Sequence, residues 1–342
     1  MLLPYNRTSS TQNIGSTRGP VQSREVRGSL VDMFSKHFDG RRYYNPDGRQ
    51  LPGLRKALLW RLTSRPEPSP RFMADVEEFK PPRCVHGTSL RVTLVNHSTV
   101  LLQQPGSNIL TDPIWSERPS PLSWVGPRRR RKPGIAFDDL PPIDAVLISH
   151  NHYDHLDLPT LRHLAARGQS NFVVPARVAQ LLRSSNVGPV HELDWGESLS
   201  FGGLTVHCVP ALHFSSRGLF DRNLTLWCGY VIESQGRMAY FAGDTAFGSH
   251  FSQIRERFGA PRLALLPIGA YEPRWFMSPV HMAPDDAVRA HAVLAAETSI
   301  AIHCGTFQLG DDGIDTPKRQ LMTIAPKETF KVLNNGQSAE IP

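Results

Sequence analysis

The chain has 342 residues, enough to bury a large core in one domain or two. The sequence holds no run of the roughly 20 apolar residues that a membrane-spanning helix needs, it starts without the apolar core of a secretory signal, and its four cysteines form no CxxC pair. We therefore expect a cytoplasmic protein without a disulfide framework. The net charge of +7 makes the position of the basic residues informative.

Residues 1 to 80 differ in composition from the rest of the chain. Ser, Gly, Arg and Asn dominate as far as Gly28, which predicts a mobile leader without a packed core. Aromatic residues then lie among basic ones up to Tyr44, and residues 54 to 62 predict a short, amphipathic, basic helix. We expect residues 1–80 to form a flexible leader with a basic and aromatic segment, and residues 81–342 to form the main domain.

A run of basic residues from Arg128 to Lys132 lies close in sequence to Trp115 and Trp124. It fits a solvated loop, a track for nucleic-acid phosphates, or a surface for anionic lipid headgroups, where each basic side chain adds about 1 kcal/mol. Because the chain shows no RNA-binding module and no aromatic stacking array, we do not expect nucleic acid to bind. We expect this run, together with residues 54 to 62, to contact anionic bilayers peripherally.

The densest group of ligand-type residues follows an apolar run at residues 143–148, which predicts a buried strand. His150 and His152 stand two residues apart directly after it, where an extended chain directs both rings toward one point. Asp154 and His155 follow where the chain turns toward a predicted helix. Imidazole nitrogen and carboxylate oxygen together suit zinc, with manganese and ferrous iron as other candidates. The sequence therefore predicts a metal site at the end of this strand.

Three later apolar runs also end at ligand-type residues. They end at His213, at His303 and at Asp244, which follows a glycine that permits a tight turn. Each residue alone has an ordinary interpretation as a turn former or a buried histidine. Because all three recur at the same kind of position, we expect them to belong to the same site.

The order of these residues resembles the metallo-β-lactamase superfamily, whose HxHxDH signature stands here at residues 150–155. Within it, the chain is similar to the phospholipases D that hydrolyse N-acyl-phosphatidylethanolamine and to their bacterial relatives, over roughly residues 84 to 335. The similar strings are LTDPIW at 110–115, HNHYDHLD at 150–157, FAGDT at 241–245, VHMAPDDAV at 280–288 and IHCGTF at 302–307. Ascorbate-lactone hydrolase-like members share several of these strings.

The resemblance implies an α/β fold of the four-layer αβ/βα sandwich type for residues 81–342, and strand-like runs alternating with helical ones fit that class. It also implies two zinc ions per chain at one edge between two sheets. One metal would be held by His150, His152 and His213, the other by Asp154, His155 and His303, with Asp244 bridging both. It further places an Asp of the Asp112 kind beside the metals, so we expect Asp112 to orient a ligand histidine rather than only to form a turn with Pro113.

Two divalent cations close together can bridge a water, lower its pKa and present hydroxide to phosphorus or a carbonyl carbon, so no Ser or Cys nucleophile is required. Neither G-x-S-x-G nor a P-loop occurs in the chain. His281 lies before a helix start at Pro284, and we expect it to contact a substrate phosphate or to protonate the leaving group, with packing or capping as the alternative. His281, Asp112 and Asp154 form the predicted catalytic set.

We therefore expect a dinuclear zinc hydrolase whose metal-bridged hydroxide attacks a phosphodiester of the N-acyl-phosphatidylethanolamine type. The alternatives are a lactonase or other carboxylic-ester hydrolase, a nuclease, and a scaffold protein that keeps the site without turnover. The basic and apolar segments favour a phospholipid over a small polar lactone. The expected partners are this substrate and a peripheral membrane surface, with a homodimer as the candidate assembly.

Overall fold

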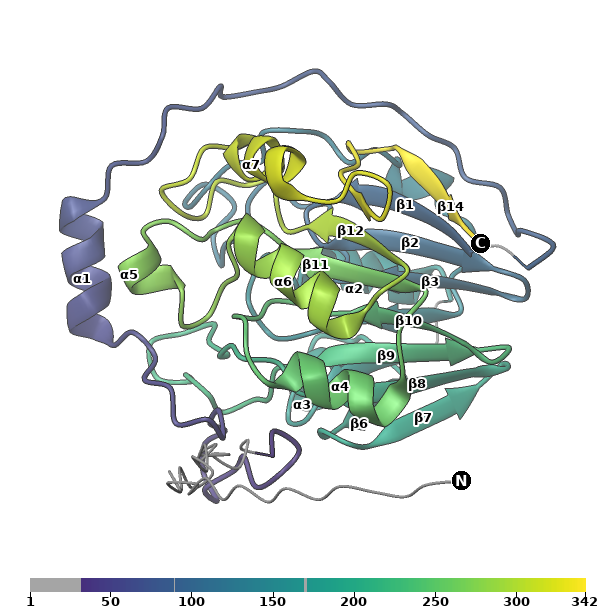
Figure 1. The fold of residues 1–342 in the computed structure, drawn as a ribbon, viewed down its shortest axis with the longest axis horizontal. Helices are drawn as coiled ribbons and strands as arrows, with labels where there is room; N and C mark the ends of the chain where they lie inside the picture. Colours follow the sequence, from purple (N-terminus) through teal and green to yellow (C-terminus); the bar gives the residue numbers. More distant parts are fainter. Residues whose placement is uncertain (1–31, 89, 169–170) are drawn as a thin grey trace, which may run out of the picture. The chain divides into compact units, whose positions relative to one another are not determined.

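The computed structural model describes residues 32–342, apart from Ser89 and residues 169–170. In this part of the chain two seven-stranded β-sheets pack face to face (Figure 1). The strand order is β14–β1–β2–β3–β4–β5–β6 in the first sheet and β13–β12–β11–β10–β9–β8–β7 in the second. The first sheet therefore comes from residues 90–193, except for β14, which lies near the C-terminus and pairs with its edge.

The strands are short, and all but one span three to seven residues. Those of the first sheet are β1 (Leu90–Asn96), β2 (Thr99–Gln104), β3 (Ser107–Thr111), β4 (Ala145–Leu147), β5 (Phe172–Pro175), β6 (Val190–Leu193) and β14 (Ser338–Ile341). Those of the second are β7 (Ser198–Phe201), β8 (Leu204–Val209), β9 (Gly229–Ser234), β10 (Arg237–Phe241), β11 (Leu263–Pro267), β12 (Thr298–Ile302) and β13 (Phe330–Lys331).

Each sheet is antiparallel in one half and parallel in the other. Pairing is antiparallel along β14–β1–β2–β3 and β7–β8–β9–β10, and parallel along β3–β4–β5–β6 and β10–β11–β12–β13. Parallel neighbours need a crossover, and helices supply most of them. The helices are α1 (Leu54–Thr63), the 3₁₀ turn η1 (Phe137–Asp139), α2 (Leu158–Ala166), α3 (Ala179–Arg183), α4 (His250–Phe258), α5 (Arg274–Met277), α6 (Pro284–Leu294) and α7 (Thr316–Ile324).

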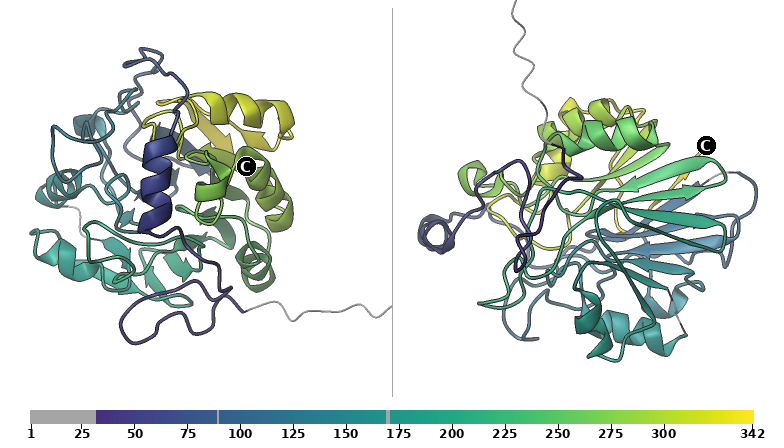
Figure 2. Two further views of the ribbon diagram at one scale, coloured as in Figure 1. Left: turned by 90° about the vertical axis from the view of Figure 1, so that its left-hand side faces the viewer. Right: turned by 90° about the horizontal axis from the view of Figure 1, so that it is seen from below.

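The apolar runs of the central strands are continuous because both faces of each sheet are covered. In β4, Leu147 points into the core between the sheets, whereas Val146 points outward to the cluster under α2 and α3. In β11, Leu265 faces the same central core and Leu266 faces the cluster under α4, α6 and α7. Helix layer, sheet, sheet and helix layer follow one another in Figure 2 (right). The predicted four-layer αβ/βα sandwich is confirmed.

Described residues that precede the expected boundary near residue 80 contact the sandwich. The predicted leader, residues 1–28, lies outside the described residues. Residues 64–79 are fixed to the sandwich by backbone hydrogen bonds, among them Met73 N to Arg130 O and Phe79 N to Gly134 O. Composition does not reveal these contacts, because they are made by the main chain.

Helix α1 forms where the sequence predicts it, but three of its leucines are not buried. Leu58, Leu59 and Leu62 are exposed, whereas Trp60 stacks on Phe276 of α5 with ring centroids 5.0 Å apart. Figure 2 (left) shows α1 in front of the end of the sandwich that faces the viewer. Across the described residues, no helix combines the length and the apolar character needed to cross a membrane.

Candidate metal centre

The predicted ligands lie at one end of the sandwich, where strands of both sheets end. β4 of the first sheet leads into the loop with His150–His155, and β8, β10 and β12 of the second lead to His213, Asp244 and His303. These three strands of the second sheet run in the same direction, because β8 and β10 are both antiparallel to β9, and β10 runs parallel to β11 and β12. Loops at this edge are where α/β sheets form ligand sites.

Three histidines have one ring nitrogen tied to an oxygen acceptor. His155 Nδ1 lies 2.6 Å from Asp112 Oδ2, and His213 Nδ1 lies 2.8 Å from Val280 O. The Ser149 hydroxyl donates to Asp112, so His150 Nδ1 donates to the Ser149 Oγ at 2.9 Å. In each ring Nδ1 therefore carries a proton, and Nε2 is the nitrogen directed into the site and available to a metal ion.

Asp112 organises the first-sheet side of the site. Its carboxylate is fully buried and accepts from the Ser149 backbone N–H at 2.7 Å, from the Ser149 hydroxyl at 2.6 Å and from His155. Burial raises the pKa of Asp112, against the opposing effect of these donors. Asp112 thus contacts His155 directly and His150 through Ser149. This is the kind of position expected for a residue that orients ligand histidines.

The free nitrogens converge on two carboxylates. Asp154 Oδ2 lies 3.2 Å from His155 Nε2 and 3.3 Å from His303 Nε2. Asp244 Oδ2 lies 3.2 Å from His155 Nε2, 3.0 Å from His303 Nε2 and 3.9 Å from His213 Nε2. On the other side, His150 Nε2 lies 2.9 Å from His152 Nδ1. The four groups of side chains that could each hold a metal ion are His97–Asp154–His155–His303, His150–His152–His213, His150–His155–Asp244 and His213–Asp244–His281.

The donor set fits divalent metal ions. His155 Nε2, Asp244 Oδ1 and His281 Nδ1 are buried and have no hydrogen-bond partner in the described structure. Buried polar atoms are ordinarily paired, so their grouping at one point indicates a bound group. Neighbouring Cys304 is not needed as a ligand, because burial raises the pKa of its thiol to about 11 and keeps it protonated at neutral pH.

The two carboxylates dominate the electrostatics of the site. Burial opposes ionisation of Asp154 and Asp244, but the neighbouring His155 ring holds the pKa of both carboxyls well below the usual range. Burial also opposes protonation of His303, but Asp244 and Asp154 raise its pKa to about 9. Burial lowers the pKa of His152 to about 4, although Asp154 and Asp244 oppose this effect. The site therefore favours positive charge between Asp154 and Asp244 and neutral imidazole around His152.

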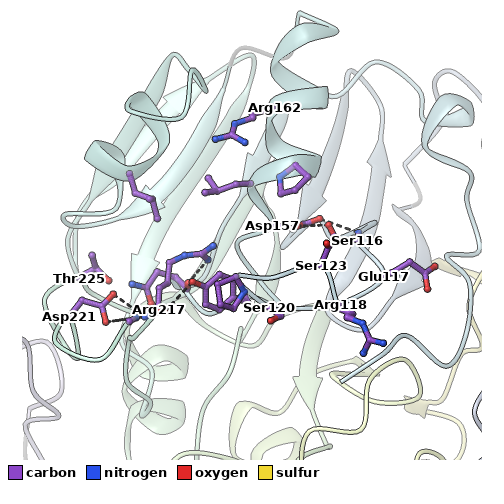
Figure 3. Close-up of a pocket in the computed structure, with 17 residues that line it drawn as sticks. Ser116, Glu117, Arg118, Ser120, Ser123, Asp157, Arg162, Arg217, Asp221 and Thr225 are labelled. Atoms are coloured by element: carbon purple, nitrogen blue, oxygen red, sulfur yellow. Dashed lines mark hydrogen bonds between the residues drawn. The ribbon is translucent and has the colours of Figure 1, made fainter. Parts of the chain in front are cut away.

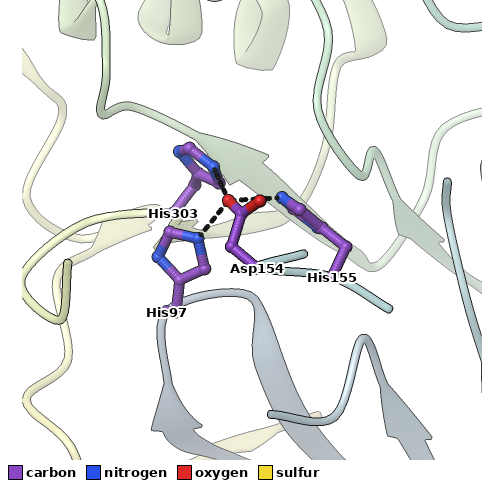
Figure 4. Close-up of side chains that lie close together, drawn as sticks. All are labelled: His97, Asp154, His155 and His303. Atoms are coloured by element: carbon purple, nitrogen blue, oxygen red, sulfur yellow. Dashed lines mark hydrogen bonds and ion pairs between the residues drawn. The ribbon is translucent and has the colours of Figure 1, made fainter. Parts of the chain in front are cut away.

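His97 belongs to the site and is missed from the sequence. It lies in the turn between β1 and β2, is 1 % exposed, and its Nε2 lies 3.0 Å from Asp154 Oδ2 (Figure 4). Its backbone accepts from His303 N and donates to the Thr306 hydroxyl, which joins the two sheets at this point. A lone histidine after Asn96 gives no local pattern, and the only available signal is that it also follows a strand.

His281 lies at the open side of the site. Its side chain is 13 % exposed, its Nδ1 lies 3.9 Å from Asp244 Oδ2, and its ring centroid lies 5.1 Å from that of His213. The loop that carries it also supplies the Val280 carbonyl to His213. His281 is thus beside the candidate ligands Asp244 and His213 as well as before the start of α6.

One glycine allows the two sheets to meet closely here. Gly243 has φ +60, and a Cβ at this position would lie 2.5 Å from the Ser149 Cβ and 3.0 Å from the Cys228 carbonyl oxygen. No side chain fits at such distances. The tight turn expected before Asp244 therefore also lets that loop pack against the residue that precedes His150.

A cavity of about 790 Å³ adjoins the ligand loop (Figure 3). It reaches that loop through Asn151 and Tyr153, which alternate with the candidate ligands. The Arg217 guanidinium lies over the Tyr153 ring at 3.8 Å and donates to Asn151 O. The other wall comes from residues 116–123. The cavity thus lies beside the ligand loop, and none of the candidate ligands lines it.

The basic run at residues 128–132 does not form the continuous surface that the sequence predicts. Arg129 and Arg131 are buried: Arg129 donates to Ile114 O, and Arg131 makes a two-nitrogen ion pair with Asp75. Only Arg128 and Lys132 are exposed. An extended chain turns alternate side chains inward, so Arg129 and Arg131 are buried and Arg130 between them is half-buried. The expected role of Arg129 and Arg131 in membrane contact is therefore wrong.

Residues 107–304 match the family described as a Beta-lactamase superfamily domain. The chain is 40% identical over 234 residues to N-acyl-phosphatidylethanolamine-hydrolyzing phospholipase D 1 of Caenorhabditis elegans, a match that covers 65% of this chain and 66% of that protein. It is also 40% identical over 284 residues to an uncharacterized protein of Mycobacterium tuberculosis, covering 81% of this chain and 75% of that one. The mitochondrial enzyme of the same phospholipase name from Saccharomyces cerevisiae is 34% identical over 66% of this chain and 50% of its own length.

Solved structures share the fold. A metallo hydrolase from the archaeon Ignicoccus hospitalis superposes with a TM-score of 0.55 at 23% identity, over 75% of this chain and 99% of its own. An isothiocyanate hydrolase from Delia radicum gut bacteria gives a TM-score of 0.58 at 22% identity, over 73% of this chain and 98% of its own. Together with the ligand geometry, these comparisons show that the chain belongs to the beta-lactamase superfamily and is a metal-dependent hydrolase with the metallo-β-lactamase fold.

Proposed function

We propose that the protein is a two-metal phosphodiesterase that hydrolyses N-acyl-phosphatidylethanolamine or a closely similar phospholipid. The observation that carries the proposal is the set of three histidines, His150, His155 and His213, whose Nδ1 atoms are held by oxygen acceptors. Their Nε2 atoms lie together with the carboxylates of Asp154 and Asp244 at one point. That set of nitrogen and oxygen donors suits zinc better than a hard cation that prefers oxygen ligands alone.

The ligands divide into two sets that share one carboxylate. His150, His152 and His213 would hold one ion, and Asp154, His155 and His303 the other. Asp244 would bridge them, since its Oδ2 lies within 3.9 Å of a nitrogen from each set. When bound, the ions would act as Lewis acids, lower the pKa of a water and offset charge on a phosphodiester.

The chain's own residues would orient these ligands and the substrate. Asp112 fixes two first-sheet histidines, directly and through Ser149. His281, with a ring nitrogen that lacks a hydrogen-bond partner, would donate to a non-bridging phosphoryl oxygen and hold the proton that the leaving alkoxide requires. His97 would keep the Asp154 carboxylate in place through its Nε2.

Two observations support a phospholipid as the substrate. The worm and yeast relatives are named for hydrolysis of N-acyl-phosphatidylethanolamine, at 40% and 34% identity. The cavity beside the ligand loop combines apolar walls, such as Leu158 and Leu181, with the guanidinium of Arg217, which suits a molecule with both a phosphate and acyl chains.

Exposed apolar side chains near that cavity would contact the bilayer. Trp124 is 74% exposed and Phe220 is 85% exposed. They lie on the loops that contribute Ser123 and Gly218 to the two sides of the cavity. With the exposed leucines of α1 and the charges of Arg128 and Lys132, they form an apolar and basic surface of the kind that binds anionic membranes.

The substrate proposal is tested by incubating zinc-loaded protein with N-acyl-phosphatidylethanolamine, a homoserine or ascorbate-type lactone, and single-stranded RNA, followed by mass spectrometry. We expect N-acylethanolamine and phosphatidic acid from the first only. Hydrolysis of the lactone alone would establish the esterase alternative, and cleavage of RNA alone the nuclease alternative.

The membrane proposal is tested with vesicles that contain phosphatidylglycerol and the substrate. Trp124→Ala combined with Phe220→Ser should lower vesicle binding and turnover on vesicles, and leave turnover of a short-chain monomeric substrate within about twofold, since the metal site is not touched. Met322→Ser, which alters an exposed side chain of α7, is the matched control. Unchanged vesicle binding in the double variant would contradict the proposed surface.

A further inference from the structure

The segment of residues 33–49, here called the N-terminal brace, contacts each second-sheet loop that carries His213, Asp244 or His281. We propose that this brace is part of the metal centre and that Arg49 is a positioning residue for the last two loops. The inference rests on the proposed two-metal function. It assigns a role in the site to a segment that composition places outside the main domain.

Arg49 joins two loops that are distant in sequence. Its Nη1 donates to Pro279 O at 3.2 Å, and its Nη2 donates to Phe247 O at 3.3 Å. Its Nε donates to Asp47 Oδ2 at 2.7 Å, which fixes the plane of the guanidinium, and the side chain is only 21% exposed. A planar fork with several donors can hold both carbonyls in one geometry, whereas an ammonium group cannot.

The two carbonyls lie next to functional positions. Phe247 is three residues after Asp244, the carboxylate between the two ligand sets. Pro279 precedes Val280, whose carbonyl holds His213 Nδ1, and is two residues before His281. A shift of the 279–281 loop would therefore change the orientation of one candidate ligand and the position of the candidate acid together.

Two other residues of the brace, Asn45 and Met33, contact the loop that carries His213. Asn45 is 4% exposed, and its Nδ2 donates to His213 O at 3.0 Å while its Oδ1 accepts from Trp227 Nε1 at 3.2 Å. Met33 is fully buried in a small cluster with Leu212 and Ala246. The brace thus fixes the main chain at His213 and fills the space between the His213 and Asp244 loops.

These contacts predict a selective effect on metal binding, which a general loss of stability would not produce. The first-sheet ligands follow one another on a single loop and have their own support in Asp112. Loss of Arg49 should therefore weaken chiefly the ion held with His213 and lower turnover, while the ion held by Asp154, His155 and His303 is weakened less. A merely structural contact would lower the melting temperature without this selectivity.

The test compares Arg49→Ala, Arg49→Lys and the control Arg71→Ala, which alters an exposed arginine in the same N-terminal region. Each protein is loaded with cobalt(II), and the visible spectrum, the two metal dissociation constants and kcat are measured. We expect Arg49→Ala to change the spectrum, to weaken one ion about 10–100-fold and to lower kcat by a similar factor, because removal of groups that orient metal ligands has effects of that size. Arg49→Lys should fall between it and the wild type, and Arg71→Ala should match the wild type.

An unchanged cobalt spectrum with both dissociation constants and kcat within about twofold of the wild type in Arg49→Ala would overturn the inference and leave the proposed function standing, since removal of an orienting group costs at least about tenfold. Equal weakening of both ions would assign Arg49 to stability alone. If Arg49→Ala does not fold, the same readouts on Arg49→Lys decide. A wild-type protein that binds no divalent metal would refute the proposed function and this inference together.

Discussion

The two sheets contribute to the metal centre in different ways. The first provides four candidate ligands from one loop after β4, so the covalent chain fixes most of their spacing. The second provides His213, Asp244 and His303 from the ends of three strands, and their positions depend on sheet packing and on outside supports such as the Val280 carbonyl and Arg49. One half of the site is therefore encoded locally, and the other half is assembled by the fold.

Asp244→Asn is the most severe test of this difference. The change removes the charge between the two ligand sets, so we expect both ions to bind poorly and kcat/KM to fall at least about 1,000-fold, which equals about 4 kcal/mol of lost transition-state stabilisation. Elemental analysis with kinetics measures both. Asp154→Asn in the first-sheet loop should lose one ion only. Two tightly bound ions in Asp244→Asn would show that the two metal sites do not share the Asp244 carboxylate.

His281→Ala should separate catalysis from metal binding on the second-sheet side. We expect two bound ions, an unchanged melting temperature and a fall in kcat of about 10²–10⁴-fold, the usual contribution of a positioned proton donor. The comparison uses a substrate that the wild type turns over at saturation. Wild-type kcat in this variant would leave His281 with a packing or capping role.

Asp112→Asn should test the local support of the first-sheet half. An amide cannot accept from His155, Ser149 N and the Ser149 hydroxyl at once, so the proton on His155 would be free to move to Nε2. We expect metal affinity or activity to fall about 10–100-fold. Ser149→Ala removes the hydroxyl contacts to His150 and Asp112 but leaves the Asp112–His155 contact, so it should have a smaller effect. Equal losses of metal affinity and activity in the two variants would show that the direct Asp112–His155 contact contributes to neither.

The smallest expected effect concerns the segment that runs along the sandwich before β1. Hydrogen bonds from Arg131 lower the pKa of Asp75, so this contact stabilises the fold above pH 3.8 and is lost as the pH falls below that value. Because Asp75 is about half exposed, Asp75→Asn should lower the free energy of unfolding by only about 1 kcal/mol at pH 7. Chemical denaturation at pH 7 and pH 3 should show the difference shrinking. A constant difference would point to packing instead.

Much of the fold and most of the site could be predicted, because the necessary signals are local. Apolar runs predict the central strands, and the HxHxDH order and the strand-end positions of His213, Asp244 and His303 predict where ligands gather. His97 could not be found this way, since it stands alone in a two-strand turn and meets Asp154 only through tertiary packing.

The incorrect predictions arise for the same reason, because they concern residues whose position depends on tertiary packing. The run 128–132 looks like a charged surface, but whether each arginine points outward depends on pairing with Asp75 or Ile114 elsewhere in the chain. The N-terminal brace has the composition of an appendage, yet its contacts are made largely by main-chain carbonyls, which composition cannot report.

Gly243 sets a limit on how this site can change. With the Ser149 Cβ only 2.5 Å from where its own Cβ would be, even alanine would force the loops of the two sheets apart. In a library randomised at positions 241–245 and selected for activity, glycine should return at 243 in nearly every survivor, as aspartate should at 244. Redesign of this hydrolase toward new substrates would therefore proceed through the cavity wall at residues 116–123 and not through the junction of the sheets.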